Sequence, residues 1–213
     1  MKATNQEIKK TPVFRIIHVR HPFQRIYSAW SDKFVSCREN PVTKKFYKPF
    51  EKYEKSILKL DDKNYPLILG KNTENITITF RTFVKWLIHN RSNHKANAHW
   101  KPMHMLCSPC AVQYDFVSHL ETIEADFEFV REKLGVSGMF EFPHANEKRL
   151  SGGNDEIELS LEQVRYSQIL KLARLYKTMD VTREMILRLY EFHKLDFELY
   201  GYSFTDFMRF FEN

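Results

Sequence analysis

The chain has 213 residues, of which 43% are hydrophobic and 15% aromatic, with a formal net charge of +6 and 6 glycines. This composition is typical of a globular domain and excludes a disordered chain, a collagen and a coiled coil. No run of about 18 apolar residues occurs, so the sequence predicts no membrane-spanning helix, and the polar segment Met1 to Lys10 does not read as a signal peptide.

Charge is distributed unevenly along the chain. The first 110 residues carry a net charge of +13, whereas the remainder carries −7. One interpretation is that an anionic partner docks on the basic half. The other is that a basic face and an acidic face of one fold neutralise each other, and charge alone does not choose between them.

The N-terminal half begins with a strand, a tight turn and a helix. Residues 13–19 form a short apolar run rich in β-branched side chains, which predicts a buried strand. Pro22 ends that run, and apolar side chains then recur from Phe23 at spacings of three and four residues. This spacing predicts an amphipathic helix with Pro22 in its first turn, where proline is tolerated.

The rest of the chain alternates helices with a second strand. Residues 39–75 are polar and rich in lysine, which predicts a surface segment with one short helix near 50–60. The later predictions are a helix over 80–89 capped by Thr79, a loop over 90–113, a strand over 114–120, a helix over 122–134 ending at Gly135, a loop over 142–156, a helix over 161–178 capped by Ser160, and a last helix from Thr182 to Gly201. This mixed order favours a three-layer α/β domain with a helical C-terminal half.

The turn between the first strand and the first helix predicts an anion site. Unpaired backbone N–H groups and the positive end of the macrodipole lie at a helix N-terminus, where a phosphate fits. Arg20 precedes that end and can donate from a planar fork, Arg25 adds charge, and the Ser28 hydroxyl lies in the second turn. The alternative is structural: Arg20 pairs with a core carboxylate and Ser28 only packs.

Cysteine and histidine residues gather in the predicted loop over 90–113. Cys107 and Cys110 form a single C-x-x-C, with His99 and His104 nearby and Cys37 far along the chain. A structural zinc site needs about four ligands and no second C-x-x-C occurs, so this pair alone indicates zinc only weakly. A Cys/His site that includes the nearby histidines is one interpretation. A disulfide in an oxidising compartment and buried thiols in a reducing one are the others.

The segment Arg20-His21-Pro22-Phe23-Gln24-Arg25-Ile26-Tyr27-Ser28-Ala29-Trp30 resembles the 3′-phosphate-binding motif of the membrane-bound carbohydrate sulfotransferases, which include the chondroitin, dermatan and HNK-1 enzymes. Trp30 stands where that pattern has tyrosine. Four further blocks are similar to the family in the same order; they are 78–87, His99-Trp100-Lys101-Pro102 with 106–110, 114–122, and 196–202.

The resemblance implies an α/β, P-loop-like three-layer sulfotransferase fold, incomplete at the N-terminus, over residues 13–204. Residues 1–12 are then a polar segment and 205–213 a C-terminal tail. The donor would be 3′-phosphoadenosine 5′-phosphosulfate (PAPS), held by residues 20–28 without a metal. The acceptor would be an anionic, chondroitin-like glycan in the Golgi lumen. The sequons at Asn75 and Asn90 would matter there.

Two features qualify what the resemblance implies for catalysis. The family carries an earlier basic loop for the 5′-phosphosulfate, and the twelve residues before Val13 hold no such sequence. A non-catalytic relative that binds 3′-phosphoadenosine 5′-phosphate (PAP) or a glycan is therefore the alternative function. His99 is the first candidate for the catalytic base, because it lies in a polar loop of the basic half and histidine has a near-neutral intrinsic pKa, and His104 is the second. The alternative for each is a loop residue that makes a structural hydrogen bond.

Basic side chains outside the motif and the aromatic content have their own interpretations. Lys33, Lys85 and the stretch 44–63 could reach an anionic glycan, or they are solvated. A nucleic-acid binder is disfavoured because no RNP, helix-turn-helix or zinc-finger pattern occurs, and the aromatic residues recur at core-facing spacings. The stripe of Tyr190, His193 and Phe197 is expected to be core.

Overall fold

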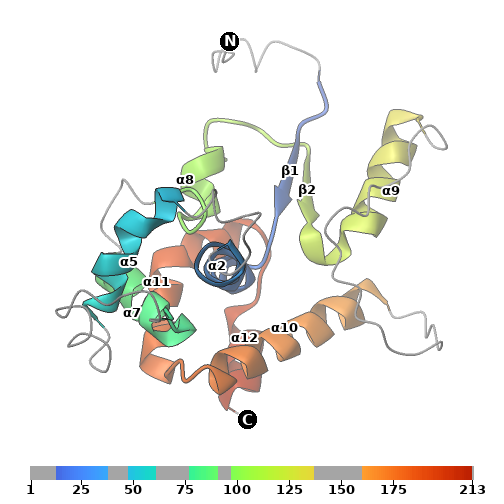
Figure 1. Cartoon of the computed structure of the whole chain (residues 1–213). Helices are drawn as coiled ribbons and strands as arrows, with labels where there is room; N and C mark the ends of the chain where they lie inside the picture. The colour runs from blue at the N-terminus through green and yellow to red at the C-terminus, as the bar shows by residue number, and fades with distance from the viewer. Residues whose placement is uncertain (1–12, 38–47, 61–76, 91–96, 137–159, 213) are drawn as a thin grey trace. The chain divides into compact units, whose positions relative to one another are not determined.

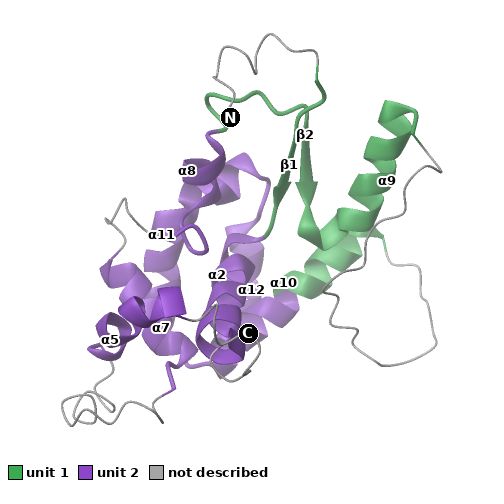
Figure 2. Ribbon diagram, turned by 45° about the horizontal axis from the view of Figure 1, so that its top comes forward, with its two compact units in different colours: residues 1–20, 109–169 green, residues 21–108, 170–213 purple. Residues whose placement is uncertain are grey.

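The computed structural model describes residues 13–37, 48–60, 77–90, 97–136 and 160–212. The chain divides into two compact units, shown in Figure 2. Unit 1 comprises residues 1–20 and 109–169, and unit 2 comprises residues 21–108 and 170–213. Figure 1 gives the element labels used below. In the described parts of the chain, no helix is both long and apolar enough to cross a membrane.

Unit 1 contains a parallel pair of strands and a helix. Strand β1 (Ile16–Val19) pairs with β2 (Phe116–His119), with Ile16 opposite Phe116. A 3₁₀ turn over Leu120–Thr122 leads into α9 (Ile123–Leu134). Helix α9 ends at Gly135, whose φ of +68° is readily adopted by glycine. Both predicted strands and the predicted end of this helix are confirmed.

Two aspartates fasten the ends of this strand pair. The Arg15 amide donates to Asp115 Oδ2 at 2.7 Å, next to the first paired residues. At the far end, the His119 amide donates to Asp126 Oδ2 at 2.6 Å. A short parallel pair has few ladder bonds of its own, so these charge-assisted hydrogen bonds fix the ends of the two strands.

Unit 2 is helical. Helix α2 (Pro22–Trp30) continues into a π-helical turn over Ser31–Ser36, and α5 (Glu51–Leu58) and α7 (Phe80–His89) follow. The short α8 spans Met103–Cys107, α11 spans Arg183–Leu199 and α12 spans Phe204–Glu212. Helix α10 (Leu161–Thr178) begins in unit 1 and ends in unit 2.

The N-caps of three helices are the predicted ones. Thr79 Oγ1 accepts from the Thr82 amide at 3.2 Å, and Thr182 Oγ1 accepts from the Met185 amide at 3.4 Å. Ser160 forms a reciprocal capping box with Gln163 at the start of α10. Local side-chain chemistry therefore sets where these helices begin.

Aromatic rings fill the core of unit 2 in two clusters. In the first, Phe23 is fully buried against Tyr176, Phe197 and Phe207, with ring centroids 4.9–5.5 Å apart. The Tyr176 hydroxyl donates to the Phe23 carbonyl at 2.7 Å, and burial raises the pKa of Tyr176 well above its ordinary value. The second cluster surrounds Trp100, which is 1% exposed; its members are Phe34, Phe50, Tyr53, Phe83 and Trp86.

Two helices form where the sequence predicted none. Residues 205–213, set apart above as a tail, form most of α12 as far as Glu212, because Phe207 packs fully buried in the first aromatic cluster. The prediction of an unbroken loop over 90–113 is wrong for α8, which is held by a carboxylate distant in sequence. The polar segment 1–12 lies outside the described residues.

The larger architecture is only partly as expected. The structure is mostly helical with a small parallel sheet, and two strands are present in the described residues. The core stripe on α11 is as predicted for His193 and Phe197, which are 1% and 2% exposed. Tyr190 is half-buried and stacks on Phe204 with ring centroids 3.8 Å apart.

Candidate functional site

The α2 motif, residues 20–28, follows β1 directly, and its residues 22–28 are the first seven of α2. Pro22 occupies the first helical position, where its missing N–H costs nothing. Ile26 is fully buried, and Ser28 in the second turn is half-buried. The predicted strand, turn and helix are therefore confirmed, and Ser28 keeps part of its surface in solvent.

His21 lies inside the core rather than on the surface. Its ring is 2% exposed and stands 5.1 Å from the rings of Phe197 and Tyr202, edge to face. Its Nδ1 accepts a hydrogen bond from the Phe23 amide at 3.2 Å and so caps α2. Burial lowers the pKa of His21 to about 3, so the ring is neutral at neutral pH and contributes no positive charge to an anion.

Arg25 reaches across unit 2 to a loop far along the chain. Its guanidinium donates to the carbonyl oxygens of Ala98 and Lys101. These contacts fasten the His99 loop, residues 97–102, to α2, and Trp100 fills the second aromatic cluster from the same loop. The sequence assigned Arg25 to an anion site, whereas the structure places two of its donor groups on backbone carbonyls.

Several charged groups gather around His99. Asp32 and Lys33 form an ion pair at 2.6 Å, and Lys33 Nζ lies 5.3 Å from the centre of the Phe50 ring, which in turn faces the His99 ring. Partial burial lowers the pKa of His99, and the nearby cations of Lys33 and Arg25 lower it further against the opposing effect of Asp32. His99 is therefore a neutral, exposed imidazole that can accept a proton.

The pKa of Asp32 shows the balance of forces in this cluster. Partial burial acts to raise the pKa of that carboxyl, but the hydrogen bond and charge of Lys33 outweigh it and lower the pKa. The Cys37 thiol also lies 3.5 Å from Asp32 Oδ1. Asp32 is thus an ionised carboxylate that partly balances the positive charge around His99.

His104 is held by a buried aspartate. Its Nδ1 lies 2.7 Å from Asp196 Oδ1, and the amides of Met103 and His104 donate to the same carboxylate at 2.7 and 2.9 Å. Asp196 is 1% exposed. Burial acts to raise the pKa of Asp196, but contacts with His193 and His104 outweigh it and keep the pKa below its usual value.

This arrangement can orient an imidazole for proton transfer. A carboxylate on Nδ1 fixes that nitrogen as the donor and leaves Nε2 to act as an acceptor. His193 Nδ1 lies 3.6 Å from Asp196 Oδ2, and burial lowers the pKa of His193, so the second histidine is neutral. Sequence reasoning placed Asp196 in a C-terminal block but gave it no role. The sequence signal that could have indicated this role was an acidic residue next to Phe197 in the apolar stripe of α11.

The structure bears on the three interpretations of the cysteines, namely a metal site, a disulfide and free thiols. Cys37, Cys107 and Cys110 all carry free thiols, and burial raises the pKa of Cys107. Within the described residues, no group of three or more histidine, cysteine and acidic side chains could hold a metal ion. A Cys/His metal site is therefore not formed by these residues.

The comparisons with known proteins agree with the family resemblance of the sequence. Residues 1–203 match the model of the sulfotransferase family. The chain belongs to that family. Carbohydrate sulfotransferase 11 of Mus musculus is 30% identical over 199 residues, which cover 92% of this chain and 48% of that protein.

Two more carbohydrate sulfotransferases are similar to this sulfotransferase-family chain. Carbohydrate sulfotransferase 14 of Danio rerio is 27% identical over a match that covers 89% of this chain and 44% of that protein. Carbohydrate sulfotransferase 9 of Homo sapiens is 29% identical over a match that covers 89% of this chain and 37% of that protein. The chain thus spans less than half the length of these relatives. No solved structure matches it significantly.

Proposed function

We propose that this chain binds PAPS and belongs to an enzyme that transfers the sulfonate to a hydroxyl of a glycan. The observation that carries the proposal is the α2 motif, which stands where a strand ends and a helix begins in a chain of the sulfotransferase family. That position offers a phosphate the positive end of the α2 dipole, with Arg20 close before it in sequence, although the Phe23 amide already donates to His21. The similarity to carbohydrate sulfotransferases supports a glycan as acceptor.

In this proposal, residues 20–28 have different roles in binding the 3′-phosphate. Arg20 supplies the charge and Ser28 a hydroxyl. His21, Pro22, Phe23 and Ile26 shape the first turns from the core side. Arg25 acts through the His99 loop that it fastens. Gln24 and Tyr27 are half-buried positions of the same segment.

Sulfonate transfer needs a base at the acceptor and stabilisation at the leaving group. The acceptor oxygen attacks sulfur while the bond from sulfur to the 5′-phosphate oxygen breaks, and PAP leaves with the electron pair. The hydroxyl proton passes to a base. Neutral His99 fits that role because its pKa is lowered and its ring is exposed. Cations beside the departing phosphate stabilise its charge, so the proposed step uses no metal.

His104 is the second candidate for the base, and the hydrogen bond that its ring donates to Asp196 favours it. The two histidines are distinguished by the His99→Gln and His104→Gln variants, assayed for sulfonate transfer from radiolabelled PAPS to chondroitin. Loss of the base lowers kcat by about 10²–10⁴-fold with little change in PAP affinity. A variant with wild-type kcat excludes its histidine as the base. If the wild type binds PAP but transfers no sulfonate, the chain is a non-catalytic relative.

The remaining parts of the proposal follow from the family. We propose that the acceptor is anionic and chondroitin-like, and that the enzyme is a membrane-associated glycoprotein of the Golgi lumen. The parallel pair β1 and β2 would be part of a P-loop-like three-layer α/β fold. Sulfation assays on chondroitin, dermatan and a neutral glycan test the acceptor, and a neutral glycan sulfated as well as chondroitin would contradict it.

A further inference from the structure

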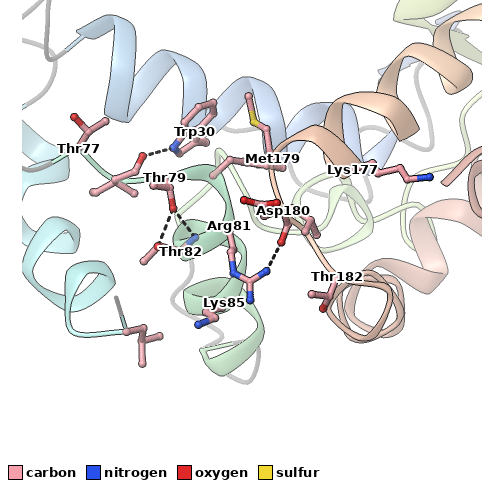
Figure 3. A pocket seen from close by; sticks show the side chains of 14 residues that line it. Trp30, Thr77, Thr79, Arg81, Thr82, Lys85, Lys177, Met179, Asp180 and Thr182 are labelled. Atoms are coloured by element: carbon pink, nitrogen blue, oxygen red, sulfur yellow. Dashed lines mark hydrogen bonds between the residues drawn. The ribbon is translucent and has the colours of Figure 1, made fainter. Parts of the chain in front are cut away.

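Unit 2 contains two adjoining cavities that the donor motif does not use. The first has a volume of about 970 Å³ and lies between the N-terminal end of α7 and the turn from α10 to α11 (Figure 3). The second, of about 770 Å³, lies between α7 and α11 at the end of α5. They share Leu60, Arg81, Lys85 and Thr182, and none of residues 20–28 lines either cavity.

Positive charge dominates this pair of cavities, which we term the basic groove. Its cationic residues are Lys59, Arg81, Lys85, Lys177 and Arg188, with His89 beside them. Two carboxylates line it as well, those of Asp180 and Glu184. The Glu184 carboxylate forms an ion pair with Arg188 at 2.7 Å. Among the described residues, the cations that line the cavities outnumber the carboxylates, which favours an anionic ligand.

Three lysines of the basic groove form no ion pair within the parts of the chain that the structure describes. Neither Lys59, Lys85 nor Lys177 has a carboxylate within salt-bridge distance among the described residues. Arg81 donates to the Asp180 carbonyl, as Figure 3 shows, and this holds the turn after α10 against α7. The groove thus has one arginine that shapes it and several lysines whose charge is available.

Helix ends add to the same potential. Thr79 and Thr182, the N-caps of α7 and α11, both line the first cavity. The positive ends of two helix dipoles therefore point to this region, and each favours an anion. The effect supplements the lysine charges.

The shape and lining of the groove favour a polysaccharide strand over a nucleic acid. Each cavity is of the size that encloses a small-molecule ligand, and two side by side suit a chain of sugar units rather than one phosphate. Single-stranded nucleic acids bind on exposed aromatic faces. The aromatic residues of the first cavity, Trp30 and Phe80, are only 9% and 2% exposed.

We propose that the basic groove binds the carboxylate and sulfate groups of an acidic glycan strand, at sugar units other than the one that receives the sulfonate. The proposal rests on the proposed function, since it takes the glycan as the acceptor. It assigns Lys85 and Lys177 as the residues that select an acidic polymer. The groove would hold the strand while the α2 motif holds the donor.

The test measures the affinity of the full chain for a chondroitin sulfate decasaccharide by calorimetry, in wild type and in Lys85→Ala/Lys177→Ala. The matched control is Lys171→Ala/Lys194→Ala, which removes the same charge from unit 2 outside the groove. We expect the groove variant to bind about tenfold more weakly, the control to change less than about twofold, and added salt to weaken wild-type binding.

Three results would overturn the proposal. The first is that wild type and groove variant bind the decasaccharide with equal affinity, and the second is that groove and control variants lose affinity equally. The third is that wild type binds a single-stranded DNA of the same charge more tightly than the decasaccharide and that the groove variant loses this DNA binding. PAP binding in the same samples reports on the donor proposal separately. A groove that binds chondroitin sulfate as expected in a protein that binds no PAP would support the groove and refute the donor site.

Discussion

Replacing His21 by phenylalanine should reduce the acid sensitivity of unit 2. The His21 ring is buried among aromatic rings, and burial lowers its pKa from 6.5 to about 3. The unfolded chain therefore binds a proton between these values that the folded chain does not. Since the unfolded state binds more protons there, the free energy of unfolding falls as the pH falls below about 6.5.

The magnitude follows from the same pKa values. Taking 6.5 for the unfolded chain and 3 for the folded one, His21 costs the fold about 2 kcal/mol between pH 7 and pH 5. His193 acts in the same direction because burial lowers its pKa too. His21→Phe removes one of these contributions. It also leaves the Phe23 amide without its acceptor, which lowers stability at pH 7 by about 1 kcal/mol.

Urea denaturation at pH 7, 6 and 5, followed by tryptophan fluorescence, measures this directly. Trp30, Trp86 and Trp100 all lie in unit 2 and are at most 9% exposed, so their emission reports on the unit that holds His21. The wild type should lose about 2 kcal/mol more than His21→Phe between pH 7 and pH 5. His89→Gln, at an exposed position, serves as the control. Equal losses in wild type and His21→Phe would refute the reasoning.

Two further predictions concern the site. Asp196→Asn should lower the free energy of unfolding, measured by urea denaturation, by about 2–4 kcal/mol, because the carboxylate accepts hydrogen bonds from two amides and from the His104 ring. The control Glu198→Gln on the same helix should change the free energy of unfolding by less than about 0.5 kcal/mol. Equal effects of the two substitutions would contradict the role of Asp196. Arg25→Met should speed amide hydrogen exchange across residues 97–102 while leaving α9 in unit 1 unchanged, since the guanidinium donates to the carbonyls of Ala98 and Lys101; unchanged exchange in the loop would show that these bonds do not fasten it.

Local signals were sufficient for most elements of the fold. Thr79, Ser160 and Thr182 cap helices where their side chains predict, and Gly135 ends α9. Helix α12 was missed although Ser203 caps it and Phe204, Phe207 and Phe211 recur at helical spacing. Its place in the aromatic cluster depends on distant segments. The three-layer arrangement stays a prediction, because it depends on long-range strand pairing that periodicity does not encode.

The candidate site was predictable by residue but not by contact. The α2 motif is contiguous, so its residues could be named from the sequence. The partners of Arg25 and His104 lie 76 and 92 residues away, and only folding brings them together. For the same reason the burial of His21 was not foreseen, because its cage is built from Phe197, Tyr202 and Phe207.

The central claim, a working 3′-phosphate site in the α2 motif, is tested most directly by calorimetry of PAP binding. We expect the wild-type chain to bind PAP and not adenosine 5′-phosphate, and Arg20→Ala to weaken binding by about tenfold or more through loss of charge-assisted hydrogen bonds. Arg174→Ala, at an exposed position of α10, should leave the affinity unchanged. A folded chain that binds no PAP, or binds it equally well without Arg20, would contradict the account.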